Sequence, residues 1–179
     1  MAQFRGGRGR EEEAEYLDDF EDVGYPTMAS PLAVAKYLMA LRPHVSRAIE
    51  IRQSWIRELG LLFEEARQGN AQQVTTRAGR LGREHVGSFR DVRASVDRFN
   101  PPEGCQDVQR AVVAWVDGMV KACEALIEVG NTGALSGMQV AQRHVTDARH
   151  AARRFNSEYN RLVTEIKVAV RTAQRERRG

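Results

Sequence analysis

The sequence predicts an all-α protein: an antiparallel up-down-up-down four-helix bundle with a long projecting fourth helix and a disordered N-terminal tail. Through most of residues 31–178, apolar side chains recur at alternating steps of three and four, which is the period of a helix with one buried face. Short breaks rich in glycine, asparagine and proline divide this stretch into four segments of helical length. Residues 1–29 instead carry few apolar side chains among many charges, which is typical of a segment without a core of its own.

The N-terminal tail, residues 1–29, changes sign along its length. Three arginines lie among glycines in the first ten residues, and eight acidic residues follow between positions 11 and 22. Apolar and aromatic side chains are interleaved with these acids or follow them: Tyr16, Leu17, Phe20, Val23 and Tyr25. This alternation is typical of a peptide that docks on a basic, partly apolar surface. We therefore expect a tail that is either disordered or docked on a partner, with Tyr16, Leu17, Phe20 and Tyr25 as contact residues.

The ordered body is expected over residues 30–179, and its first helix over about 31–68. Ser30 followed by Pro31 is a typical helix start, since the hydroxyl can cap the first turn and proline suits the first helical position. Pro43 is expected to break or kink this segment, so that residues 31–42 are either a separate short helix or the bent first turns. In the main segment Ile49 falls on the expected apolar face, and Ile51 falls off it.

The second and third helices are expected over about 70–99 and 102–130. Asn70 with Gln73 forms a capping pair, and the seam of the second helix includes His85. Its glycines at positions 79, 82 and 87 indicate a close approach to a neighbouring helix, or a bend. In the third helix the seam keeps steps of three and four without exception: Cys105, Val108, Val112, Trp115, Met119, Ala122, Leu126 and Val129.

The fourth helix, about 134–177, has the longest regular pattern of the chain. Its eleven seam positions are all apolar or amphipathic: Met138, Ala141, Val145, Ala148, Ala152, Phe155, Tyr159, Leu162, Ile166, Ala169 and Ala173. Because short turns make neighbouring helices antiparallel, its C-terminal end must project beyond the shorter second and third helices. We expect residues 31–42, which lie at the same pole, to cover that projecting end. We also expect the functional surface at this pole.

No residue pattern predicts catalysis or a bound cofactor. Metal-binding bundles of this class use Glu-x-x-His pairs, and the nearest match, Asp147 with His150, lies off the seam. His85 is expected to be a hydrogen-bonded core histidine, and Cys105 and Cys123 to be reduced, structural thiols. The sequence therefore predicts no enzyme, no catalytic residue, no metal site, no cofactor and no small-molecule substrate.

Charge indicates where a partner would bind. Residues 131–179 hold ten basic and four acidic side chains, whereas the tail is strongly acidic. The expected contact residues on the fourth helix are Arg154, Arg161, Lys167, Arg171, Arg175, Arg177 and Arg178. We expect a non-enzymatic interaction or assembly subunit that docks on protein partners, a second copy of the chain included, through the acidic-aromatic tail and the basic end of this helix.

The alternative is a protein that binds nucleic acid or an anionic membrane surface with the same arginines, which the acidic tail masks until a partner displaces it. The N-terminus has no apolar run of the kind that a secretory signal needs, and we expect a cytoplasmic location.

Overall fold

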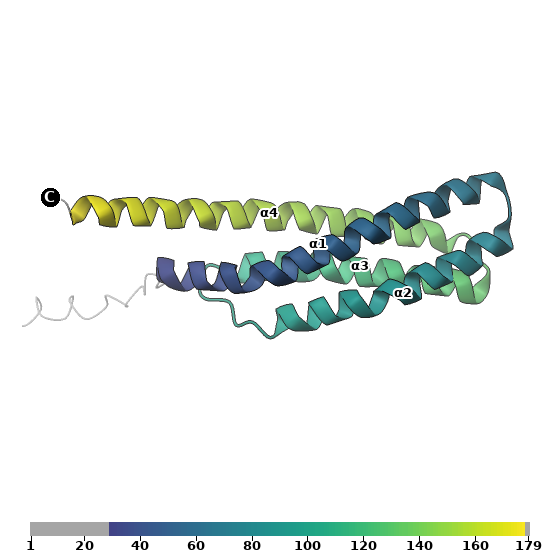
Figure 1. Ribbon diagram of the computed structural model, residues 1–179, viewed down its shortest axis with the longest axis horizontal. Coiled ribbons are helices and arrows are strands. Elements are labelled where there is room, and N and C mark those ends of the chain that lie inside the picture. The colour runs from purple at the N-terminus through teal and green to yellow at the C-terminus, as the bar shows by residue number, and fades with distance from the viewer. Residues whose placement is uncertain (1–28, 178–179) are drawn as a thin grey trace, which may run out of the picture.

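A computed structural model describes residues 29–177, and these residues form four antiparallel helices and no strand (Figure 1). The helices are α1 (Pro31–Gln68), α2 (Ala71–Asp97), α3 (Gln106–Thr132) and α4 (Gly137–Glu176). The predicted all-α four-helix class is confirmed, and most helix ends lie within three residues of their predicted positions. The expectations for residues 1–28, including the contact residues Tyr16, Leu17, Phe20 and Tyr25, lie outside the described residues, as does Arg178.

The capping residues named from the sequence begin two of the helices. The Ser30 hydroxyl accepts a hydrogen bond from the backbone N–H of Ala33 at 3.2 Å. The Asn70 side chain accepts one from the N–H of Gln73 at 3.1 Å. Each cap satisfies a donor that the first turn leaves without an intrahelical acceptor. The α3–α4 turn begins at Gly133, whose φ of 72° lies in the left-handed region that glycine adopts without strain.

α1 is one helix that continues through Pro43. Residues 31–42 are therefore its first turns and not a separate helix, while the bend expected at Pro43 stays a prediction. Proline lacks the N–H that would reach the carbonyl four residues earlier, so the helix has one hydrogen bond fewer at this point.

The core is formed by the seams that the spacing predicted. All eight predicted seam residues of α3 are buried. The α2 seam is buried or half-buried throughout, and the α4 seam is so as far as Ala169. The prediction for α1 was wrong at two positions, because Ile51 is buried whereas Ile49 is 41% exposed. The reason is that α1 packs mainly against α2 and only lightly against α4, which leaves the side that carries Ile49 uncovered.

Glycine and alanine bring the backbones of α2, α3 and α4 close together. A Cβ atom at Gly82 of α2 would lie 2.4 Å from the Cys123 carbonyl oxygen of α3. One at Gly118 would lie 2.8 Å from the Ala148 Cβ of α4. The predicted close approach of α2 to its neighbour is thus confirmed at Gly82, but nothing lies within 4 Å of a Cβ at Gly87. α3 is consequently the central helix, with tight contacts on both sides.

The starts of α1 and α3 and the ends of α2 and α4 meet at one pole, and α4 projects beyond it (Figure 1). The first turns of α1 close the body here, since the Tyr37 and Phe99 rings lie 6.4 Å apart at a right angle. They do not cover the projecting turns of α4, where Val168 is 57% and Val170 is 47% exposed. That part of the prediction was wrong, because the apolar face of α1 is occupied by the junction between α2 and α3.

The close helix contacts predict opposite effects for two glycine substitutions in α2. Gly82→Ala should lower the free energy of unfolding by about 1–3 kcal/mol, because the added methyl meets a backbone carbonyl that cannot move freely. Gly87→Ala should raise it by up to about 1 kcal/mol, because the site is open and alanine favours the helix. Urea unfolding of both variants measures the difference, and equal effects would contradict the close packing described.

Candidate interaction surfaces

The described residues contain no cluster of histidine, cysteine or acidic side chains that could hold a metal ion. Asp147 and His150 are exposed, as their register predicted. His85 is half-buried, its Nδ1 lies 3.1 Å from the Leu81 carbonyl oxygen, and its Nε2 lies 4.0 Å from a Glu58 carboxylate oxygen. It is therefore the hydrogen-bonded histidine that the sequence predicted. No helix within residues 29–177 has the length and apolar character needed to cross a bilayer.

Both cysteines are buried and unpaired in the part of the chain that the structure describes. Burial raises the pKa of the Cys123 thiol from 9.0 to about 12. Burial also raises the pKa of the Cys105 thiol, although the nearby Arg161 guanidinium opposes this shift. A thiol that stays protonated is a poor nucleophile, so these cysteines act as small apolar core residues.

The basic residues predicted as contacts on α4 fall into two groups. Arg154 and Arg161 lie within the body of the bundle, whereas Lys167, Arg171, Arg175 and Arg177 lie on the projecting end and are exposed. No residue within 29–177 forms a salt bridge with any of these last four.

Arg161 is held by its own surroundings. Its guanidinium donates hydrogen bonds to Glu158 at 2.8 Å and to Glu165 at 2.7 Å, and these carboxylates raise the pKa of the guanidinium. It also donates to the Gly104 carbonyl oxygen at 3.3 Å, which fixes the loop before α3 to α4. Because its charge is already paired, this predicted contact residue has a clear structural role in the body.

Arg154 lies on the side of α4 that faces α3. It lines a hollow together with Asp107, Arg110 and Glu158, so carboxylates are already near its guanidinium. Its neighbour in sequence, Arg153, lines a different surface, on the side that faces α1. These two adjacent arginines of α4 therefore face different helices, Arg153 toward α1 and Arg154 toward α3.

The projecting end of α4 is amphipathic, but no helix of the described range, residues 29–177, packs on its last turns. The seam spacing continues through Ala169 and Ala173, yet Ala173 is exposed. Lys167, Arg171 and Arg175, spaced by four, form a basic stripe on roughly the opposite side of the helix. The end of α4 thus keeps the apolar spacing of a bundle helix beyond the point where the other helices end.

Exposed apolar side chains gather at the same pole. Leu32 and Met39 of α1, one heptad apart, are 64% and 74% exposed, and Val168 and Val170 of α4 are also exposed. Within residues 29–177, these four are the majority of the seven large apolar side chains that are exposed. Isolated exposed apolar residues are ordinary, but their concentration at one end is typical of an interaction surface.

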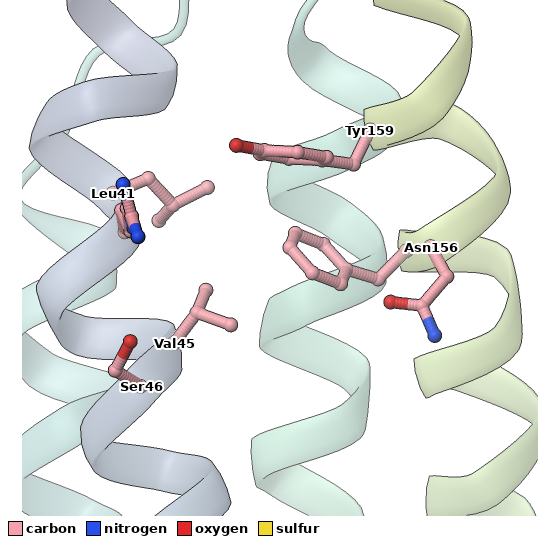
Figure 2. Close-up of a pocket in the computed structure, with 7 residues that line it drawn as sticks. Leu41, Val45, Ser46, Asn156 and Tyr159 are labelled. Carbon is pink, nitrogen blue, oxygen red and sulfur yellow. The ribbon is translucent and has the colours of Figure 1, made fainter. Parts of the chain in front are cut away.

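A second surface, which we call the α1–α4 groove, is lined by residues 41–52 of α1, residues 149–159 of α4 and Trp115 of α3. Two adjoining hollows of about 180 and 270 Å³ make up this groove, and Val45, Phe155 and Asn156 line both. Figure 2 shows Leu41, Val45 and Ser46 on α1 facing Asn156 and Tyr159 on α4. The Phe155 and Tyr159 rings, 5.7 Å apart, form the aromatic part of its floor.

The rim of the α1–α4 groove is basic. Its charged lining residues are Arg42, Arg52, Arg149 and Arg153, and no carboxylate lines either hollow. None of the four forms a salt bridge with a residue in the described range, whereas most acidic residues of α2 and α3 are paired with nearby arginines. The groove therefore combines an apolar, aromatic floor with four arginines that have no acidic partner within residues 29–177.

The sequence did not predict this groove. Phe155 and Tyr159 were expected in the seam, and the arginines of the rim were not among the predicted contacts. One signal was present: Ile49, which the spacing placed on the apolar face of α1, lines the groove.

The geometry defines a four-helix bundle protein with two surfaces that no element within residues 29–177 covers, the α4 end and the α1–α4 groove. Comparison of the chain with models of protein families, with curated proteins and with solved structures found no match.

The raised thiol pKa values predict slow alkylation of the native protein. At pH 8 a shift from 9.0 to about 12 lowers the thiolate fraction of Cys123 by about three orders of magnitude. Iodoacetamide should therefore label both thiols slowly in the native protein and rapidly in urea, as measured by mass spectrometry.

The same shift makes stability depend on pH. Because the folded thiols ionise at higher pH than the unfolded ones, their contribution is complete below about pH 9 and is lost as pH rises above it. Denaturation midpoints that stay constant from pH 8 to pH 10.5 would contradict the burial of these thiols.

Proposed function

We propose that the protein is a non-enzymatic interaction or assembly subunit that docks on protein partners through the acidic-aromatic tail and the basic end of α4. The supporting observation is the continuation of the α4 seam beyond the bundle, where the seam residue Ala173 is exposed and Val170, beside the seam, is 47% exposed. A heptad pattern without a packed neighbour is the usual form of a helix that pairs with another chain.

The chemistry of this end favours a partner helix that is apolar on one face and acidic beside it. Lys167, Arg171 and Arg175 would pair with those acids, while the Val170 side of α4 packs on the apolar face. Leu32 and Met39 of α1 are further exposed apolar side chains at the same pole. Partners of this kind include a second copy of the chain, whose own tail carries acidic and aromatic residues.

Partner capture from the source cell tests this function. The variant Val170→Asp should abolish capture, because it places a charge where the partner helix packs, and deletion of residues 1–29 should remove the second contact. Neither change should shift the melting temperature by more than about 2 °C, because Val170 lies outside the buried core and the sequence of residues 1–29 carries few apolar side chains. A control, Leu61→Asp, places the same charge at a 55% exposed site on α1 far from this pole. Capture that survives both changes would rule out these docking elements.

The alternative proposal is binding to nucleic acid or an anionic membrane surface through the basic stripe of α4. One observation favours it: Lys167, Arg171 and Arg175 share one stripe and have no salt bridge within residues 29–177. Against it, residues 161–177 include no aromatic side chain that could stack on a base.

Titration with duplex DNA, RNA and anionic vesicles at 50 and 200 mM salt distinguishes the alternatives. If nucleic acid or lipid is the partner, Arg171→Gln with Arg175→Gln should weaken binding and flatten its salt dependence, whereas Val170→Asp should matter far less. The double change Arg57→Gln with Arg143→Gln removes the same charge elsewhere and is the control. Binding that is absent or insensitive to salt would remove the alternative.

A further inference from the structure

The α1–α4 groove has the chemistry of a receptor for an acidic-aromatic peptide. Its floor is formed by Val45, Phe155 and Tyr159, which offer apolar and aromatic contact area. The arginines of its rim have no carboxylate partner within residues 29–177. A peptide that fills it must therefore bring apolar side chains for the floor and carboxylates for the rim.

Residues 11–25 of this chain have that composition. Eight acidic residues surround Tyr16, Leu17, Phe20 and Val23, and the segment has no basic residue. Tyr16, Phe20 and Val23 are spaced by four and three residues, so a helix formed on docking would place all three on one side, with acids flanking them. We propose that residues 11–25 of the same chain dock in the α1–α4 groove.

The length of the chain allows this contact within one molecule. Val45 follows Pro31 by fourteen residues, about 21 Å along the helix axis. Residues 24–30 can span about 23 Å when extended, so Val23 can reach the near end of the groove. The docked segment then runs antiparallel to α1, and its remaining residues lie toward Arg52 and Arg149.

The same chain is favoured over a second copy because the segment is tethered beside the groove. A short tether gives an effective concentration in the millimolar range, well above the concentration of a second molecule in dilute solution. The groove is separate from the projecting end of α4, so occupancy of the groove does not depend on the function proposed above. Only one consequence rests on that function: a docked tail is unavailable to a partner until the partner displaces it.

Disulfide trapping in the full-length protein tests the proposal. Gly24→Cys places a thiol in the tail without removing a docking side chain, and Asn156→Cys places one at the exposed rim of the groove. The native cysteines are buried, so mild oxidation reports on the introduced pair. We expect a disulfide within one chain, which non-reducing electrophoresis and peptide mass spectrometry identify. The control, Gly24→Cys with Ala94→Cys, uses an exposed site on α2 near the same pole and should react about tenfold more slowly.

The rim arginines supply a second measurement. Arg149→Gln with Arg153→Gln should slow trapping about two- to tenfold, because two ion pairs with the tail are lost. Arg154→Gln, next in sequence but facing α3, should leave the rate unchanged. All these positions are exposed, and unchanged melting curves would show that the variants fold.

Three results would overturn the proposal. A disulfide between two chains would assign the groove to the tail of a second copy. Equal trapping at Asn156 and Ala94 would show that the tail has no preferred site. Equal effects of the Arg153 and Arg154 changes would show that the groove charges are not involved. Because partner capture is not measured here, each result leaves the proposed function standing.

Discussion

The close approach of α3 to both α2 and α4 is the constraint on which the rest of the structure depends. Gly79 of α2 and Gly130 of α3 are so near that a Cβ atom on Gly130 would lie 2.5 Å from the Gly79 Cα. Gly118 makes the equivalent contact with Ala148 on the other side of α3. The backbones of α2 and α4 are thereby held close to that of α3. The large side chains of α3 fill the remaining space between the three helices.

The α1–α4 groove follows from the way α1 joins this three-helix unit. Within residues 29–177, side chains hold α1 in place, ion pairs with α2 included, and no glycine brings its backbone close to another helix. Its buried residues, among them Leu59 and Leu62, lie mainly against α2, so the side toward α4 meets no tightly packed neighbour. A helix that is well covered on one side and loosely covered on the other leaves a groove between itself and the next helix. The arginines that line it from α1 and α4 form no salt bridge within the described part of the chain. An acidic occupant could therefore pair with these arginines and also pack on the apolar floor.

The spacing of apolar residues was sufficient to predict the fold, because a seam of regular period commits a helix to one buried face. It succeeded for α3 at every position from Cys105 to Val129. It failed at Ile49 and Ile51, since one sequence cannot tell which of two neighbouring helices will pack closely. The groove was out of reach for the same reason: its width depends on how closely α1 packs on α4, which the spacing of apolar residues within one segment does not fix. Counting charges along the sequence located the basic end of α4 but did not show that Arg161 is paired. That pairing depends on the three-dimensional positions of Glu158, Glu165 and the Gly104 carbonyl group.

Pro43 gives α1 an internal boundary. The absent N–H interrupts the hydrogen-bond ladder between the first three turns and the remainder of the helix, so unwinding that begins at Pro31 can stop there at little cost. Those turns carry Tyr37, which lies over Phe99 at the end of α2. Local fraying would therefore open this end of the core to water while α2, α3 and α4, which glycine contacts hold together, stay intact. The amide protons before Pro43 would then exchange with solvent as a unit separate from those after it.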